Sequence, residues 1–437
     1  ISSRLADSIL STRLSNENGD PAYEVARDVF RPSGIPLEEG DLLVQPDLAN
    51  TFKMIAANGT DAFYTGDLAE AIFQTQLATR SGNPDGVGRM TTDDLAGYEA
   101  ALREPVEGEY RGFRIVSMPP PSSGGLTVIQ ILKLIERFPM GDVNQEFGLG
   151  QTQAMHVFIE ACRLAFADRA VWMGDTDFVD LPVNGLIDDD YVAMRSALID
   201  PDMAADLVEA DDPRPFEENN HKGKGKAKLA QLNLPDMEGL NTTHFTIVDR
   251  DGNIVTCTTT IESAWGTGLM VPGYGFMLNN ELTDFNGTPT LNLDPGNFNP
   301  GANDVAAGKR PRSSMAPTLI FDKKKPLAAF GSPGGSSIIN TVAQMAINLI
   351  DHRRTVQEAV DAPRLRQTVA NGDTRWELGF SDEVFEALRA KGPSFRSSSE
   401  VLGSVQAIVL DKKKQYGAAD KRRIGGVVSV RKEEIVH

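Results

Sequence analysis

The stretch NTTHFTIVDRDGNIVTCTTTI, residues 241–261, carries the clearest structural signal in the sequence. Its runs HFTIVD and IVTCTTTI are rich in β-branched residues and flank RDGN, whose Asp-Gly pair is typical of a tight hairpin turn. We therefore predict two antiparallel strands joined by this turn. The polar side chains of Thr242, Thr243 and His244 stand where the first strand enters the core, and this placement needs a physical reason.

Thr242 admits two interpretations. Threonine is a good strand former, so Thr242 and Thr243 can simply begin a strand without any chemistry. Alternatively, the bond between Asn241 and Thr242 is cut, and Thr242 then carries a hydroxyl and a free α-amine on one residue. The α-amine has an ordinary pKa of about 7.7–8.0, so it can accept the hydroxyl proton near neutral pH. A threonine activated by its own amine is a known type of nucleophile.

Composition limits the classes of function. The chain has 437 residues, which suits one large domain or two closely packed domains. Its formal net charge is −18, and such an acidic surface repels nucleic acid and anionic membranes, so we expect neither as a partner. We find no apolar stretch of about 20 residues that would span a membrane, and no signal peptide pattern in the opening ISSRLADSIL.

Cysteine and histidine usage gives no metal pattern. Cys162 and Cys257 lie in apolar, periodic stretches, which favours buried free thiols and leaves a single disulfide open. The five histidines are scattered, so we expect no metal site built from them, and no organic cofactor is implied. His156 lies within a long apolar helix, where we interpret it as a residue that packs between helices.

Elements in the first half of the chain are mostly helical. Hydrophobic periodicity predicts helices over 48–59, 67–82, 126–138 and 153–172, and a hairpin over 104–118 that turns at Arg111-Gly112. The segment 199–240 is first acidic and broken by proline, then basic and spaced by glycine, which is typical of a mobile, poorly packed linker.

After residue 242 the pattern changes to strands. We predict strands over 274–282, 316–321, 327–332, 405–411 and 427–431, and helices over 335–351, 355–363 and 382–392. Strands stacked between helical layers indicate an α/β sandwich.

Further stretches place polar groups beside these strands. GSPGGSS, residues 331–337, puts unhindered backbone N–H groups before a helix, which suits an oxyanion or is a plain tight turn. Glu281 and Asp284 follow a predicted strand, where they can bind an ammonium group or face water. Ser313 and Ser314 precede another strand and can bond a carboxylate or serve the structure alone.

Several of these stretches resemble the γ-glutamyltranspeptidases, in the same order, from about residue 41 to 428. The motifs that carry the resemblance are YRGFRIVSMPPPSSGG, EACRLAFADRA, NTTHFTIVDRDGN, GTGLMVPGYGFMLNNELTDFN, KRPRSSMAPT, GSPGGSSIIN and GAADKRRIGG. The resemblance implies a four-layer αββα sandwich of the N-terminal nucleophile hydrolase type, an α/β (α+β) fold. It also implies a precursor that cuts itself between Asn241 and Thr242 into a large subunit, 1–241, and a small subunit, 242–437.

The resemblance implies acyl transfer from γ-glutamyl compounds such as glutathione to water or to an amino acid or peptide. In this sequence Thr242 matches the nucleophile, and Thr260 matches the second threonine that orients it. Gly334 and Gly335 match the residues whose N–H groups form the oxyanion hole.

Both charges of the γ-glutamyl head group are matched in the same way. Arg103 resembles the arginine that pairs with the α-carboxylate, for which a guanidinium fork is well suited. Ser313 and Ser314 match serines that bond the same carboxylate, and Asp284 matches the acid that holds the α-ammonium group.

Two further carboxylates and one loop follow from the resemblance. Glu281 sits where the family has Glu or Gln beside the acid, and Glu262 matches a substrate contact for which some relatives have Asn. The loop 287–308 has a length that suggests a lid over the pocket, with Phe298 as its candidate aromatic; a surface loop is the alternative.

One feature of the family is not found in this sequence, namely its glycine-rich N-terminal region with a GGNAxDA-like helix. The resemblance further implies a periplasmic or extracellular enzyme. Two other functions stay open: a cephalosporin (glutaryl) acylase of the same superfamily, and an inactive, uncleaved homologue that acts as a binding protein. Retention of Arg103, Asp284, Ser313 and Ser314 favours a γ-glutamyl head group.

Overall fold

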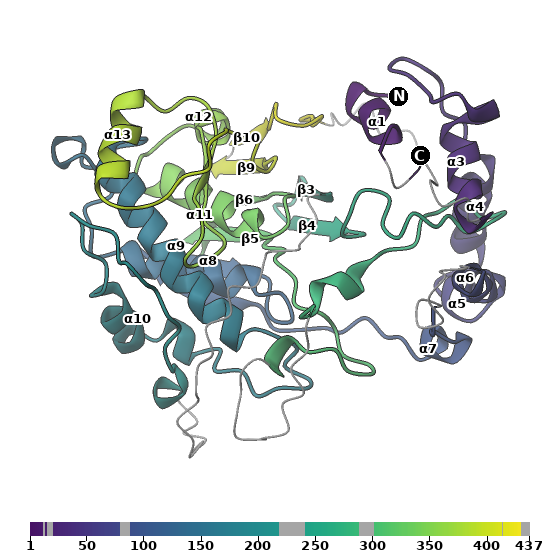
Figure 1. Ribbon diagram of the computed structural model, residues 1–437, viewed down its shortest axis with the longest axis horizontal. Helices are drawn as coiled ribbons and strands as arrows, with labels where there is room; N and C mark the ends of the chain where they lie inside the picture. Colours follow the sequence, from purple (N-terminus) through teal and green to yellow (C-terminus); the bar gives the residue numbers. More distant parts are fainter. Residues whose placement is uncertain are drawn as a thin grey trace. The chain divides into compact units, whose positions relative to one another are not determined.

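A computed structural model of the chain shows helices packed around β-sheets (Figure 1). The structure describes residues 1–11, 14, 21–78, 88–217, 241–287, 301–412 and 414–429. The chain divides into two compact units. Unit 1 comprises residues 1–103 and 261–281, and unit 2 comprises residues 104–260 and 282–437.

Unit 1 is helical. Its α-helices are α1 (Ser3–Ile9), α3 (Glu24–Phe30), α4 (Pro46–Asn58), α5 (Asp61–Tyr64), α6 (Asp67–Leu77) and α7 (Thr92–Ala96). The two longest helices confirm the helices predicted over 48–59 and 67–82, although α6 ends at Leu77. Helix α7 begins with a capping box, in which Thr91 and Asp94 satisfy each other's backbone N–H groups.

The segment 261–281 packs into two apolar clusters of unit 1. Trp265 lies against Phe30 with ring centroids 4.5 Å apart, and Phe276 lies against Phe63 at 5.7 Å. The prediction of a strand over 274–282 is therefore wrong. The segment forms turns and a single bridge between residues 270 and 277, because its apolar side chains pack against helices.

Unit 2 is built on a six-stranded antiparallel sheet with the order β1-β2-β5-β6-β9-β10. Its strands are β1 (Val106–Tyr110), β2 (Phe113–Ser117), β5 (Thr318–Asp322), β6 (Lys325–Gly331), β9 (Gln406–Asp411) and β10 (Lys414–Ala419). β1 and β2 form the hairpin predicted over 104–118, turning at Arg111-Gly112. β2 pairs with β5, so segments from before and after residue 241 share one sheet.

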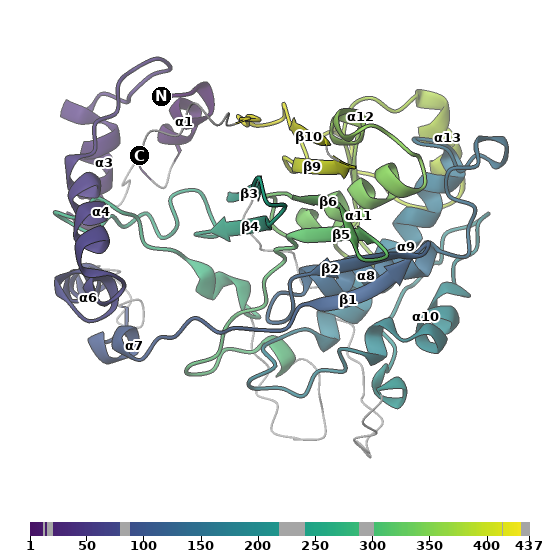
Figure 2. The same cartoon turned by 180° about the vertical axis from the view of Figure 1, so that it is seen from behind.

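Helices cover one face of this sheet (Figures 1 and 2). The helices of unit 2 are α8 (Gly124–Ile135), α9 (Thr152–Trp172), α10 (Asp189–Ser196), α11 (Ser337–Ile350), α12 (Val356–Asp361) and α13 (Asp382–Ala390). One continuous core joins α8, α9 and α11 to sheet residues such as Ile115, Ile320 and Phe330. Helix α9 is buried on nearly all sides, which explains why its periodicity is weak for its length.

A second, two-stranded sheet packs on β6 and β9. It consists of β3 (Thr242–Val248) and β4 (Ile254–Thr260), paired from Thr242↔Thr260 to Val248↔Ile254, as the opening sequence pattern predicts. A two-residue pair, β7 (Leu365–Arg366) and β8 (Arg375–Trp376), completes the strands that the structure describes. Unit 2 thus has a layer of helices, the six-stranded sheet and the two-stranded sheet, which are layers of the predicted α/β sandwich.

The predicted linker over 199–240 is wrong in its first part. Residues 199–217 follow α10 without a strand and include a 3₁₀ turn (Arg214–Phe216), and they place Ile199, 2% exposed, and Val208, 5% exposed, in the core. Burial of these apolar residues outweighs the acidic composition that suggested disorder. Residues 218–240 of that prediction, and most of the loop 287–308 with Phe298, lie outside the described residues. At the end of the chain, residues 427–429 form no strand.

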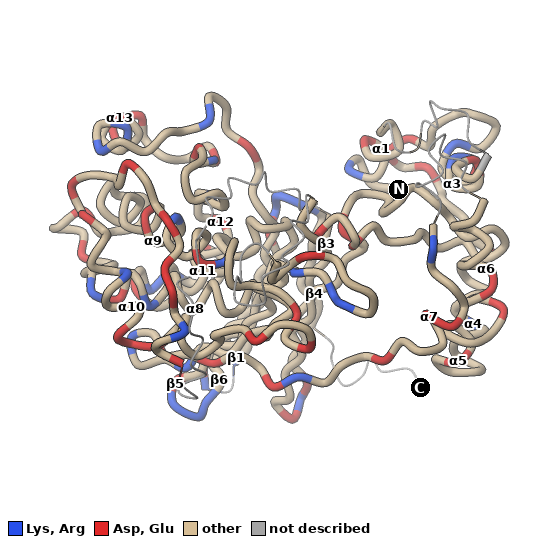
Figure 3. Tube along the Cα trace, turned by 60° about the horizontal axis from the view of Figure 1, so that its bottom comes forward, with Lys and Arg blue, Asp and Glu red and all other residues tan. Residues whose placement is uncertain are grey.

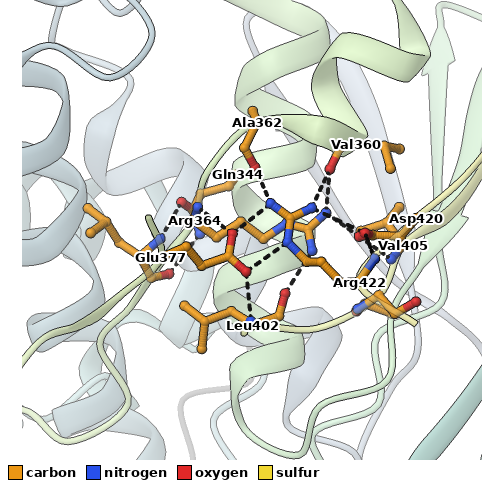
Figure 4. A network of polar contacts seen from close by, with 12 residues as sticks. Gln344, Val360, Ala362, Arg364, Glu377, Leu402, Val405, Asp420 and Arg422 are labelled. Carbon is orange, nitrogen blue, oxygen red and sulfur yellow. Dashed lines mark hydrogen bonds and ion pairs between the residues drawn. The ribbon is translucent and has the colours of Figure 1, made fainter. Parts of the chain in front are cut away.

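A buried network of arginines and carboxylates ties the end of β10 to the 362–377 region (Figure 4). Arg364 donates to Asp420 at 2.7 Å, and Arg422 donates to Glu377 at 2.6 Å and to Asp420 at 3.2 Å. Glu377 also accepts from the backbone N–H of Leu402 at 2.7 Å. Each charge thus has an opposite partner, which a buried charge requires.

Charged residues of both signs are interspersed on the surface helices of unit 2, as around α10 and α13 (Figure 3). Cys162 and Cys257 are free thiols, the first buried and the second partly buried, which agrees with the expectation of free thiols. His156 is buried on α9, as predicted, and its Nε2 bonds the carbonyl of Asp200 at 2.8 Å. Within the described ranges, no helix has the length and apolar character needed to cross a membrane.

Candidate active site

Thr242 and Thr260 meet at the open end of the β3–β4 hairpin. They are the first residue of β3 and the last of β4, and they stand directly opposite each other in the register. The Thr242 hydroxyl donates to the Thr260 hydroxyl with an Oγ1–Oγ1 distance of 3.2 Å, and Thr242 is 7% exposed. The predicted nucleophile and its predicted orienting partner are therefore in contact.

A polar ladder continues from this pair along the inner face of the hairpin. His244 Nδ1 lies 2.8 Å from Thr258 Oγ1, and its Nε2 lies 3.1 Å from Thr246 Oγ1 and 3.3 Å from Thr256 Oγ1. Burial lowers the pKa of His244 to about 4, so the ring is neutral at neutral pH. Hydroxyl groups can donate or accept, so they satisfy either tautomer of a neutral imidazole.

The turn after β6 contains Gly334 and Gly335, directly before helix α11. Both have positive φ, +142° and +58°. A Cβ atom at Gly334 would lie 2.5 Å from Ser337 Oγ, so this turn requires glycine in addition to its unusual backbone. The first amides of α11 bond back to the carbonyls of Gly334 and Gly335. Backbone N–H groups at a helix N-terminus are suited to stabilise an oxyanion.

Ser313 and Ser314 lie against the 122–124 segment and α9. Arg169 donates to Ser314 Oγ at 2.7 Å and to Ser123 Oγ at 2.8 Å, and Ser123 in turn donates to the carbonyl of Ser313 at 2.8 Å. Arg169 and Ser314 are 5% and 3% exposed. A hydroxyl that accepts from a guanidinium keeps its own proton for another acceptor, and the buried positive charge favours an anion there.

Asn303 connects the backbone at Asp284 with the segment that carries Ser313 and Ser314. Asp284 ends the 3₁₀ turn η7 (Glu281–Asp284), and its carbonyl accepts from Asn303 Nδ2 at 2.8 Å. The Oδ1 atom of Asn303 accepts from the backbone N–H of Arg312 at 2.8 Å. Asn303 is 2% exposed, so one buried amide connects the backbone at Asp284 with the residue just before Ser313.

Arg423, which follows Arg422 of the buried arginine network, contacts Thr242. Arg423 Nη1 donates to the carbonyl oxygen of Thr242 at 3.4 Å. Arg422 and Asp420 are fixed by the network of Figure 4, and so the backbone that carries Arg423 is fixed with them. This contact connects the 420–423 segment to the first residue of β3.

Three predicted site residues belong to unit 1. Arg103 is partly buried at its boundary. The carboxylate of Glu262, 4% exposed, accepts from Ser263 and from Asn280. Glu262 has φ +74°, a strained conformation for a residue with a side chain, and such strain clusters at functional sites. The backbone N–H of Glu281 donates to Asn279 at 3.0 Å.

Sequence patterns did not assign roles to Arg169, Ser123, Asn303 or Arg423. One signal was present: Arg169 lies in a mostly apolar helix, and a cation that is buried there needs polar or charged partners. The other residues are polar groups in loops, where sequence spacing does not reveal the partner. Within the part of the chain that the structure describes, no group of His, Cys, Asp and Glu has the arrangement of a metal site.

Comparison with known proteins gives the same family as the sequence motifs. The family model described as Gamma-glutamyltranspeptidase matches residues 1–430. A glutathione hydrolase proenzyme of Bacillus subtilis (strain 168) is 39% identical, covering 97% of this chain and 68% of that protein. The Acylase ACY 1 proenzyme of Pseudomonas sp. (strain SE83) is 36% identical, covering 92% of this chain and 65% of that protein.

The fold is also that of a solved relative. The crystal structure of cephalosporin acylase from Bacillus halodurans superposes with a TM-score of 0.80 at 25% identity, over 99% of this chain and 71% of that one. The chain thus spans about two thirds of the length of the curated proteins that it matches. With the family model matched over residues 1–430 and identity of 39% to a curated member, the chain belongs to the γ-glutamyltranspeptidase family.

Proposed function

We propose that this protein is a γ-glutamyltransferase and glutathione hydrolase that activates itself by cutting its own chain. The observation that carries the proposal is the contact between the Thr242 and Thr260 hydroxyls, 3.2 Å apart at the head of β3, in a member of this family. A strand that begins with a buried, hydroxyl-bonded threonine has the arrangement of an N-terminal nucleophile once the preceding bond is cut.

Activation cleaves the Asn241–Thr242 bond and yields a large subunit, 1–241, and a small subunit, 242–437. The two parts stay together because β2 of the large part pairs with β5 of the small part, and because α8, α9 and α11 share one core. Before cleavage the nitrogen of Thr242 is an amide, which is not a base. After cleavage it is an amine that can take up the hydroxyl proton.

Turnover then proceeds in two acyl transfers. Thr242 Oγ1 attacks the γ-carbonyl carbon of the donor while its proton moves to the α-amine of Thr242. The N–H groups of Gly334 and Gly335 stabilise the tetrahedral oxyanion, and the amine leaves with the proton. Water or an acceptor amine attacks the γ-glutamyl ester at the same carbon and restores the Thr242 hydroxyl. Thr260 orients the Thr242 hydroxyl for the first attack and lies beside the same oxygen when it leaves the ester in the second step.

The γ-glutamyl head group is recognised by its two charges. Ser313 and Ser314 donate to the α-carboxylate, and the buried Arg169 behind Ser314 supplies positive potential. Asp284 accepts from the α-ammonium group. For Arg103, Glu262 and Glu281 the family resemblance alone supports a role in substrate binding.

The proposal is tested by intact mass and by release of amine from a γ-glutamyl anilide. We expect the wild-type chain to yield two fragments that separate before Thr242, and to hydrolyse the anilide. Thr242→Ala abolishes both, whereas Thr243→Ala, the adjacent control, retains cleavage. A single 47.4 kDa chain that releases no amine would refute the proposal and would favour a binding protein. Cleavage that persists in Thr242→Ala would show that another residue is the nucleophile.

A cephalosporin acylase is the second candidate function. The acylase from Bacillus halodurans has the same fold, and the Acylase ACY 1 proenzyme is 36% identical to this chain. A glutaryl group lacks the α-ammonium charge, so it loses the interaction with the Asp284 carboxylate that we propose for a γ-glutamyl group. We therefore expect glutathione to be hydrolysed faster than a glutaryl-cephalosporin, and the opposite order would favour the acylase. From the family resemblance we also propose that the enzyme acts in the periplasm or outside the cell.

A further inference from the structure

His244 lies between the two sheets of unit 2, two residues after Thr242. Its ring covers the backbone of Gly331, the last residue of β6. A Cβ atom on Gly331 would lie 2.4 Å from Cε1, 2.5 Å from Nδ1 and 2.9 Å from Nε2 of this ring. The contact is thus closer than any other residue type at position 331 would allow.

Gly331 faces the hairpin because side-chain directions alternate along a strand. Phe330, its neighbour, is fully buried in the core formed with the helices, so Gly331 points to the other face of the sheet. The imidazole fills the space that this glycine leaves. The distance between β3 and the end of β6 is therefore set by the thickness of one aromatic ring.

The ring itself is held rigidly. Both nitrogens bond hydroxyls of the hairpin, Nδ1 to Thr258 at 2.8 Å and Nε2 to Thr246 at 3.1 Å. The side chain is 4% exposed. A ring fixed at both nitrogens cannot rotate to yield space, so it transmits the position of one strand to the other.

This contact lies between the two candidate reacting groups. Thr242 is two residues from His244 along β3, a span of about 7 Å in a strand. The Gly334–Gly335 turn begins three residues after Gly331. Between Gly331 and this turn, Ser332 is tied to the 404 segment, because its Oγ accepts from the backbone N–H of Ser404 at 2.9 Å. Any change in the spacing at Gly331 therefore alters the separation between Thr242 Oγ1 and the N–H groups of the turn.

We propose that His244 is a positioning residue, which sets the distance from the nucleophile Thr242 to the oxyanion-binding turn at Gly334–Gly335. The inference rests on the proposed function, since it assigns a role relative to those two groups. It goes beyond that function because the side chain of His244 bonds Thr258, Thr246 and Thr256, and none of these is a group to which the proposed function assigns a role. Ordinary packing between sheets predicts lost stability in its absence, whereas positioning also predicts a loss in kcat with KM retained.

The test is a double-mutant cycle in the full chain. Gly331→Ala pushes the sheets apart, and a misplacement of about 1 Å costs on the order of 100-fold in rate, so we expect kcat for γ-glutamyl anilide hydrolysis to fall about 100-fold with KM within about twofold. His244→Thr removes the ring but retains a hydroxyl for the ladder, and we expect about a tenfold loss in kcat. The double variant should recover at least about tenfold relative to Gly331→Ala, because the added methyl group then has room.

Matched controls separate positioning from general damage. Gly426→Ala adds a methyl group where no atom lies within 4 Å. His352→Asn replaces another histidine of unit 2 whose pKa burial lowers to about 4. Both should keep kcat within about twofold of the wild type.

Each outcome decides between the alternatives. Effects of Gly331→Ala and His244→Thr that simply multiply in the double variant would overturn the proposal, as would equal changes in kcat and KM. If Gly331→Ala does not fold, His244→Thr alone decides: kcat within about twofold of the wild type refutes the positioning role. A wild-type chain without cleavage or turnover refutes the proposed function instead, while coupling between positions 244 and 331 in urea unfolding still reports the contact itself.

Discussion

Asp420 is the residue whose replacement tests the buried network most directly. Its Oδ2 accepts from Arg364 Nη2 at 2.7 Å and from the Val405 N–H at 3.0 Å, and its Oδ1 accepts from the Arg422 N–H at 2.9 Å. Asp420 is 1% and Arg364 is 2% exposed. Asp420→Asn preserves the shape but removes the charge and turns an acceptor into a donor that faces other donors.

The cost follows from what remains. Arg364 stays buried and charged, because a guanidinium does not lose its proton in proteins. It keeps bonds to the carbonyls of Leu402 and Val360 at 2.7 and 2.8 Å, which offset part of the loss. Breaking a buried ion pair by removal of one partner costs about 3–5 kcal/mol. With those two carbonyls retained, we expect Asp420→Asn to lower the free energy of unfolding by about 3 kcal/mol.

The pH dependence has a definite sign. Burial alone would raise the pKa of Asp420, but Arg364 and the backbone N–H groups outweigh it and hold the pKa below its usual value. A carboxyl with a depressed pKa in the folded state stabilises the fold above its unfolded pKa of about 3.9 and loses this contribution as the pH falls through the folded value. The stability difference between wild type and Asp420→Asn should therefore shrink below about pH 4.

Urea unfolding at pH 7 and at pH 3–4 provides the measurement. Glu386→Gln is the matched control, since its pair with Arg389 has 75% and 50% of the side chains exposed, and such surface pairs contribute about 0–1 kcal/mol. A loss below about 1 kcal/mol for Asp420→Asn would refute the reasoning, and so would a difference that grows as the pH falls. The same variant should slow cleavage before Thr242, because the 420–423 segment carries Arg423 to the Thr242 carbonyl.

Two further predictions concern the hydroxyl groups of the site. Thr260→Val keeps the shape of the side chain but removes the hydroxyl that accepts from Thr242. The loss of one hydrogen bond, about 1 kcal/mol, predicts a kcat that is roughly five- to tenfold lower, with KM retained. An unchanged kcat in steady-state assays would contradict a role for this pair. Arg169→Lys keeps the charge but cannot bond Ser123 and Ser314 together as a planar fork does. We expect a KM for the γ-glutamyl donor raised roughly tenfold, which corresponds to about 1.4 kcal/mol, against little change in kcat; a KM equal to that of the wild type would remove Arg169 from substrate recognition.

Local patterns predicted the elements that depend on neighbours in sequence. The Asp-Gly turn fixed the register of β3 and β4, and this register alone places Thr242 opposite Thr260. Helix α11 follows from its hydrophobic periodicity, and the hairpin of β1 and β2 follows from its turn. These features need no knowledge of the rest of the chain.

Features that depend on distant segments were wrong or escaped prediction. Residues 274–282 have strand-like composition, but Phe276 packs on the helices of unit 1 instead of pairing in a sheet. Residues 199–217 look like a linker until Ile199 and Val208 are seen in the core. The role of Asn303 depends on Asp284 and Arg312, two loop positions that its side chain happens to bridge. Such partners are set by tertiary packing, which a single sequence does not encode locally.

The pairing of β2 with β5 has a thermodynamic consequence if the chain is cut before Thr242, as we propose. Its register runs from Phe113↔Asp322 to Ser117↔Thr318, so the central sheet would contain strands from both products of that cleavage. Unfolding of the uncut chain is unimolecular, but unfolding of the cut protein releases two separate chains. The midpoint of the cut form should therefore depend on protein concentration, and its refolding requires an encounter between two molecules. The proposed self-cleavage would thus convert one folded chain into an assembly of two chains that dilution disfavours.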